Sequence, residues 1–145
     1  MHINKAEIRA LIPHSDLMCL LDEVLEWDDR SFACVTNTHR DPANPLRREG
    51  SLSAVHAFEY GAQAAAVHGG LRARAAGKVP PPGYLAALRE GQLHVTRLDF
   101  IHLPLKIAAT RVYGEGANIV YEFVLSAATI VVAEGRVTVV QRTQR

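Results

Sequence analysis

One helix-forming run in the middle of the chain is apolar on nearly every side and contains a single acid, Glu59. The run extends from residue 54 to residue 67 and reads AVHAFEYGAQAAAV. A helix that is apolar all round is enclosed by its fold rather than laid on the surface. The sequence therefore predicts a core helix with other elements wrapped around it. A carboxylate is rarely buried without a partner or a chemical role, so Glu59 is the first candidate for acid/base chemistry.

The first half of the chain predicts a short helix and a β-hairpin before the core helix. Asn4 is placed to cap a helix that ends at Leu11, and Glu7 stands where a capping box requires it. Residues 18–27 and 31–38 are β-prone, and the turn 28–30 separates them. A polar loop at 40–50 then leads to the core helix. We expect that helix to begin near Ser51 or Ser53 and to end near Gly69 and Gly70.

The second half predicts three or four long strands. The β-prone segments are 92–100, 105–113, 119–127 and 130–140, and they follow a basic, proline-rich connection at 72–83. With 145 residues and 48% hydrophobic content, the chain fits one compact domain over residues 1–145. The economical arrangement is α+β, a curved antiparallel sheet wrapped around the helix at about residues 53–70. Such a sheet leaves a strand edge exposed, and pairing two edges across a dyad would cover it. We therefore expect a dimer.

Composition excludes several classes of function. A formal net charge of +1 argues against a general nucleic-acid binder. The sequence has no signal-peptide core and no run long enough to cross a membrane, so we expect a soluble, cytoplasmic protein without membrane insertion. Cys19 and Cys34 lie in apolar surroundings and are expected to be reduced packing residues. The seven histidines are scattered, and we expect no metal site.

Two motifs resemble the FabZ- and FabA-type dehydratases that act on 3-hydroxyacyl groups carried by acyl carrier protein (ACP). Residues 11–24 (LIPHSDLMCLLDEV) resemble the opening motif of that family. Residues 59–64 (EYGAQA) resemble its central-helix motif, in which a glutamine follows the glutamate by four residues. Residues 84–86, 98–100 and 132–135 are similar in order and spacing, so the resemblance spans most of the chain. Residues 18–22 and 39–46 (HRDPANPL) are most similar to the ApeP-type dehydratases of aryl-polyene gene clusters.

The resemblance implies the hotdog fold, with active sites formed between two subunits. It also implies a dehydratase that converts a 3-hydroxyacyl thioester on ACP to a trans-2-enoyl thioester, in a fatty-acid-like or aryl-polyene pathway, without a cofactor. This chemistry needs a base near C2, an acid near the departing C3 hydroxyl and a donor on the thioester carbonyl. A glutamate in an apolar tunnel can hold a proton near neutral pH, so Glu59 is expected to be the acid.

The other expected contacts come from the same helix. Backbone N–H groups at its start, at Ala54 and Val55, would bind the carbonyl oxygen because that end carries unsatisfied donors and a positive dipole. Gln63 follows Glu59 by one turn and completes the substrate-binding set, where it would hold the carboxyl in place. Gly61 is expected to permit close packing of the helix backbone.

Three histidines compete for the role of base. FabZ-type enzymes place the catalytic histidine about fourteen residues before the glutamate, and that position is Pro45 here. His14 comes first because it belongs to the opening motif, which the resemblance implies lies near the mouth of the site. His56 precedes Glu59 by three residues and shares its helix face, so it is the alternative base. His39, at the entrance of the 40–50 loop, is the third candidate. The alternative for His39 is a solvated turn residue with no chemical role.

Two other functions remain open from the sequence alone. The chain is either a dehydratase or a non-catalytic hotdog subunit that supports a catalytic partner, and the missing loop histidine favours the second reading. A hotdog thioesterase, in which Glu59 activates water, is the third. The dimer is accordingly a homodimer or a heterodimer with a related hotdog subunit. Asp22 is expected either to anchor the opening loop or to be exposed on its strand. Five basic residues could dock an acidic carrier protein, namely Arg47, Arg48, Arg72, Arg74 and Lys78.

Overall fold

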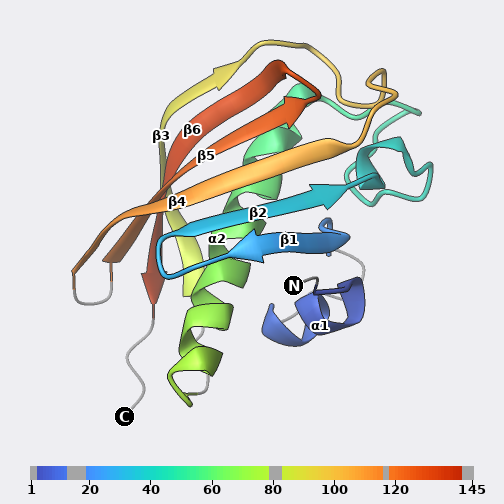
Figure 1. The fold of residues 1–145 in the computed structure, drawn as a ribbon. Helices are drawn as coiled ribbons and strands as arrows, with labels where there is room; N and C mark the ends of the chain where they lie inside the picture. Colours follow the sequence, from blue (N-terminus) through green and yellow to red (C-terminus); the bar gives the residue numbers. More distant parts are fainter. Residues whose placement is uncertain (1–2, 13–18, 79–82, 116–117, 142–145) are drawn as a thin grey trace.

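The computed structural model describes residues 3–12, 19–78, 83–115 and 118–141. Six strands and one long helix make up most of this part of the chain (Figure 1). In chain order the elements are α1 (Lys5–Leu11), β1 (Glu23–Trp27), β2 (Ser31–Thr36), the 3-10 turns η1 (Thr38–Arg40) and η2 (Ala54–His56), α2 (Ala57–Ala75), β3 (Gly83–Leu93), β4 (Leu105–Glu115), β5 (Asn118–Ala127) and β6 (Ile130–Gln141).

The strands form one antiparallel sheet in the order β1-β2-β4-β5-β6-β3. Helix α2 covers one face of this sheet, and α1 packs beside α2 next to β1 (Figure 1). The α+β arrangement of a curved antiparallel sheet around a central helix is confirmed. Strands β1 and β3 are the two edges of the sheet.

The two N-terminal elements follow the local signals in the sequence. Asn4 caps α1 in a capping box with Glu7, as expected. Strands β1 and β2 form the expected hairpin, and its turn is closed by Asp28, whose Oδ1 accepts the N–H groups of Arg30 and Ser31.

Helix α2 begins where the sequence indicates but continues farther. Ser53 is the N-cap of the 3-10 turn that leads into α2, and its side chain accepts the N–H of Val55. The helix does not end at Gly69 and Gly70 but runs to Ala75, and Gly77 follows with φ of 71°. A glycine inside a helix costs only about 1 kcal/mol relative to alanine. Gly70 offsets that cost because it lets the side chain of Leu11 on α1 approach the helix closely.

The first strand of the second half was predicted in the wrong place. Strand β3 covers Gly83–Leu93 rather than 92–100, and it pairs along its length with β6. Residues 94–100 instead form a connection that is hydrogen-bonded to the segment at the start of the core helix. The N–H of Ala54 donates to the carbonyl of Thr96, and the N–H of Leu98 donates to the carbonyl of Leu52. The prolines and glycines around 80–83 mark a boundary, but only the pairing with a strand some fifty residues away selects the extended form.

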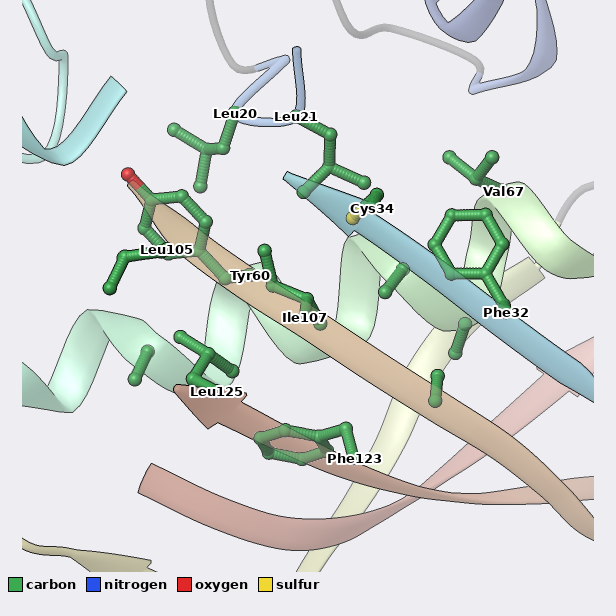
Figure 2. Packing of buried hydrophobic residues seen from close by; sticks show 14 of the residues in the cluster. Leu20, Leu21, Phe32, Cys34, Tyr60, Val67, Leu105, Ile107, Phe123 and Leu125 are labelled. Atoms are coloured by element: carbon green, nitrogen blue, oxygen red, sulfur yellow. The ribbon is translucent and has the colours of Figure 1, made fainter. Parts of the chain in front are cut away.

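The core lies between α2 and the inner face of the sheet. Inward positions alternate along β5, where Tyr121, Phe123 and Leu125 are fully buried. Figure 2 shows Phe123 and Leu125 facing the helix, together with Ile107 from β4. Gly61 lies where Phe123 meets the helix, and its role in close backbone packing is confirmed.

Both cysteines are free and buried, so the expectation of reduced packing residues is confirmed. Burial raises the pKa of the Cys34 thiol. Within the described residues, no group of three or more His, Cys, Asp or Glu side chains is arranged to hold a metal ion. In the same part of the chain, no helix has the length and hydropathy needed to cross a membrane.

Candidate active site

Glu59 lies in the first turn of α2 and is half-buried. Gln63 is one turn farther along and is 7% exposed. The Nε2 of Gln63 donates a hydrogen bond to Oε1 of Glu59 over 3.2 Å. The two residues of the central-helix motif are therefore in contact, and Gln63 holds one oxygen of the carboxyl.

A second hydrogen bond fixes which way the Gln63 amide faces. The backbone N–H of Leu20 donates to Oε1 of Gln63 over 2.9 Å. An N–H requires the amide oxygen as its acceptor, so the amide nitrogen must point the other way, toward Glu59. Leu20 comes just before β1, and this bond brings the start of the hairpin to the side of Glu59.

The three histidine candidates fall in different places. His14 lies outside the described residues. His56 is the last residue of η2, half-buried, immediately before α2 and three residues from Glu59. His39 is fully buried rather than solvated, and its Nε2 donates to the carbonyl oxygens of Ile101 and Leu103 at 3.1 and 3.0 Å.

His39 therefore acts as a structural link between two loops. Its Nε2 carries the proton, because both partners are carbonyl oxygens. Its Nδ1 is buried without a hydrogen-bond partner among the described residues. Desolvation lowers the pKa of His39, with the charges of Arg40 and Arg47 as further causes. A ring this enclosed cannot reach a substrate.

The helix start offers fewer free donors than the sequence indicates. The N–H of Ala54 is already bonded to Thr96 over 3.0 Å, so it is not available for a carbonyl oxygen. The N–H of Val55 donates to its own cap, Ser53 Oγ, over 3.3 Å, and the Val55 side chain is 50% exposed. Of the two expected donors, Val55 is the one that a substrate could capture.

Asp22 anchors the chain in front of β1. Its carboxylate accepts hydrogen bonds from Lys5 Nζ at 2.8 Å and from the N–H of Asn37 at 2.7 Å. Thr36 Oγ1 lies 3.2 Å away, but its hydroxyl has a nearer acceptor, the carbonyl oxygen of Leu20 at 2.5 Å. Burial alone would raise the pKa of Asp22, but these bonds and the charge of Lys5 together hold the pKa below its usual value. Asp22 is thus an anchor rather than an exposed strand carboxylate.

Sequence reasoning missed a buried polar cluster beside Glu59. Tyr60 is fully buried, and its hydroxyl lies 2.9 Å from Thr38 Oγ1 and accepts a bond from Asn44 Nδ2 over 3.3 Å. In Figure 2 the hydroxyl of Tyr60 points to the side of the core where Leu20 lies. A tyrosine inside an apolar helix needs a partner for its hydroxyl, and that requirement is the signal in the sequence.

The five basic residues do not form one surface. Arg47 and Arg48 lie in the loop before the helix start, whereas Arg72, Arg74 and Lys78 lie at or beyond the other end of α2. A helix of 19 residues is about 28 Å long, so the two groups are far apart. The guanidinium of Arg47 also donates to the carbonyl oxygens of His39, Asp41 and Gly50, and so closes its own loop.

A pocket on the outer face of the sheet is separate from this site. It is lined by residues of β1, β2 and β4 and of the turn between β1 and β2, and Glu59 is not among them. Glu59 and Gln63 lie on α2, on the side of the sheet that the helix covers.

The family model for ApeP-like proteins, described as ApeP dehydratase, matches residues 6–145. The chain belongs to the ApeP-like dehydratase family. No curated protein matches the sequence.

Solved structures of the same fold include a dehydratase and two proteins described as thioesterases. The dehydratase heterocomplex ApeI:P from Xenorhabdus doucetiae is 23% identical with a TM-score of 0.85, covering 94% of this chain and 91% of that one. A putative thioesterase from Shewanella oneidensis is 13% identical with a TM-score of 0.65, over 96% and 94% of the two chains. A hypothetical thioesterase with coenzyme A from Streptococcus pneumoniae is 14% identical with a TM-score of 0.59, over 84% and 86%. At these identities the likeness shows the fold, which is the hotdog fold expected from the sequence.

Proposed function

We propose that this chain carries a site that removes water from a 3-hydroxyacyl thioester to give a trans-2-enoyl thioester, with Glu59 as the acid. The observation that carries the proposal is the hydrogen bond from Gln63 to Glu59, with Gln63 itself fixed by the backbone of Leu20. Membership of the ApeP-like dehydratase family supports the reaction type.

The geometry suits a single proton transfer to the leaving group. The base takes the proton from C2, the C2–C3 double bond forms, and the C3 hydroxyl leaves as water with the proton supplied by the acid. Gln63 occupies Oε1 of Glu59. Oε2 is then the oxygen that carries the transferable proton, because it lies on the other side of the carboxyl. An N–H donor on Oε1 also stabilises the carboxylate left after transfer.

His14 is the proposed base, with His56 as the alternative. The bond between Leu20 and Gln63 supports His14, since Leu20 belongs to the same opening motif and bonds the residue that contacts Glu59. His56 adjoins the helix start and stays close to Glu59 in any case. His39 is not proposed, because its ring is buried and bonded to two carbonyl oxygens. Val55 is the proposed donor to the thioester carbonyl.

We further propose that the working unit is a dimer in which a second hotdog subunit adjoins β3. Strand β3 is a sheet edge of 11 residues, and its Leu88 and Leu93 side chains are 38% and 40% exposed. A long, partly apolar edge favours pairing with another strand. The ApeI:P structure is a heterocomplex, and Pro45 replaces the loop histidine here; both support a related rather than an identical partner.

The proposed substrate carrier is an ACP, which is an acidic protein. Arg47 and Arg48 lie on the loop before the helix start, on the Glu59 side of α2, and are the basic residues suited to guide the carrier there. Arg72 is less suited, because it pairs with Asp29 over 3.0 Å at the far end of the helix.

The test is mass-spectrometric turnover of a 3-hydroxyacyl-ACP by the purified protein, alone and with a co-expressed hotdog partner. Formation of the enoyl thioester by the wild type and its loss in Glu59→Gln would support the proposal. Gln63→Leu should lower kcat without abolishing it, since the carboxyl remains. Release of the free acid in place of the enoyl product would identify a thioesterase. Activity with the partner that survives Glu59→Gln would make this chain a non-catalytic subunit.

A further inference from the structure

The backbone of Leu20 is held on both of its polar atoms. Its N–H donates to Gln63, as described above. Its carbonyl oxygen accepts two hydroxyl groups, from Thr36 at 2.5 Å and from Thr38 at 2.6 Å. A carbonyl that receives two short hydrogen bonds at once is closely fixed in position. The N–H of the same residue lies only two backbone torsions away, so anchoring the carbonyl restricts where that N–H can point.

The direction of the hydrogen bonds behind Leu20 follows from the partners. The carbonyl of Leu20 can only accept, so the hydroxyl of Thr38 donates to it. Tyr60 therefore donates to Thr38, across 2.9 Å, and in turn accepts from Asn44. The result is one ordered chain of donors that starts at Asn44 and ends at Leu20.

Burial gives this chain its rigidity. Thr38 is half-buried, but its partner Tyr60 is 0% exposed and Asn44 is 6% exposed. In such surroundings a polar group that turns away from its partner finds no water to replace it, so one arrangement prevails. Burial also raises the pKa of Tyr60 to about 12, so its hydroxyl keeps the proton that it donates.

We infer that Thr38 is a positioning residue of the Glu59 site. Its hydroxyl holds Leu20, the N–H of Leu20 holds Oε1 of Gln63, and Nε2 of Gln63 then faces Oε1 of Glu59. This inference rests on the proposed function and adds the residues that set the orientation of the acid. If Leu20 moved, the Gln63 amide could turn over and present its oxygen to the carboxyl of Glu59. That contact would favour the protonated carboxyl and hinder the transfer of its proton to the leaving hydroxyl group.

The experiment compares Thr38→Val with Thr38→Ser in the same dehydration assay. Thr38→Val keeps the shape but removes the hydroxyl, and we expect kcat to fall about ten- to hundredfold with little change in KM, as for a slightly misplaced catalytic group. The alkaline limb of the kcat profile should move to higher pH, because a carboxyl that loses an N–H donor holds its proton more tightly. Thr38→Ser should restore both.

Tyr60→Phe and Tyr121→Phe separate positioning from stability. Tyr60→Phe removes the donor to Thr38 and should lower kcat in the same direction. Tyr121→Phe removes a buried hydrogen bond to His68, farther along α2, and should lower stability without changing kcat. If Thr38→Val fails to fold, Tyr60→Phe gives the decisive measurement.

Two results would have different meanings. Unchanged kcat and pH profile in Thr38→Val and Tyr60→Phe, in a protein that loses turnover with Glu59→Gln, would overturn the positioning role and leave the proposed function intact. Turnover that survives Glu59→Gln would refute the proposed function itself.

Discussion

The ring of Phe123 on β5 lies against the backbone of Gly61 on α2, with no room for a methyl group between them. A Cβ on Gly61 would fall 2.5 Å from the ring, well inside normal contact. The helix therefore approaches the sheet as closely as its backbone allows, at the residue midway along the chain between Glu59 and Gln63. The site depends on this contact because α2 carries both residues.

Replacing Gly61 with alanine should destabilise the protein. Overpacking a core costs about 1–3 kcal/mol, and the better helix propensity of alanine returns about 1 kcal/mol. We expect a net loss of up to about 2 kcal/mol, measured as a lower midpoint in urea unfolding. Gly69→Ala is the matched control, because a Cβ there meets nothing within 4 Å. It should raise the midpoint, and an equal loss in both variants would contradict the packing explanation.

Replacing Ser53 with alanine should cost stability and spare turnover. The cap bond to Val55 is lost, which costs about 1 kcal/mol in comparable caps. The N–H of Val55 then becomes free for the thioester carbonyl, so kcat should stay at or above the wild-type value. Urea unfolding and the dehydration assay measure the two effects separately. A fall in kcat larger than the loss of folded protein would show that the cap itself is needed for catalysis.

Acid should destabilise the protein below about pH 6.5. Desolvation lowers the pKa of the two buried histidines, His39 and His68, in the folded state. An unfolded histidine takes up a proton near pH 6.5, so below that pH the unfolded state binds more protons and the free energy of unfolding falls. Urea unfolding at pH 7.5, about pH 6.5 and about pH 5.5 measures this slope, above the range where carboxylates titrate.

His68 should contribute more clearly than His39 to this pH dependence, because both of its ring nitrogens are hydrogen-bonded. Its Nε2 donates to the carbonyl of Asp28 at 2.7 Å, and its Nδ1 accepts from Tyr121 at 2.6 Å. Protonation would place two donors face to face at Nδ1. A flat stability profile between neutral pH and pH 5.5 would contradict the prediction.

The two thiols should resist modification in the folded protein. Burial raises the pKa of Cys34, so its reactive thiolate is scarce. Cys19 is only 5% exposed, so a reagent reaches its sulfur poorly. An aromatic disulfide reagent should label neither thiol quickly in buffer and both in denaturant. Rapid labelling of the native protein would mean that the start of the hairpin opens readily around Cys19.

Much of this protein could be predicted from the sequence because the signals are local. The capping box at Asn4 and Glu7, the cap at Ser53 and the hairpin turn at Asp28 involve residues within a few positions of each other. The apolar pattern of the helix that carries Glu59 and Gln63 also indicated that the helix is buried. The resemblance carried by the opening motif at residues 11–24 and the central-helix motif at residues 59–64 agreed with the ApeP-like dehydratase family.

The tertiary structure decided what depends on distant residues. Strand β3 is extended because β6 pairs with it, and α2 passes Gly70 because Leu11 packs there. His39 could not be recognised as buried until the carbonyls of Ile101 and Leu103 were placed around it. In the same way, only the fold brings Leu20 and Thr38 to Gln63, since hydrogen bonds across 18 and 43 residues leave no periodic pattern in a sequence. Local patterns therefore pointed to Glu59 and Gln63, and long-range contacts determined how their side chains are held.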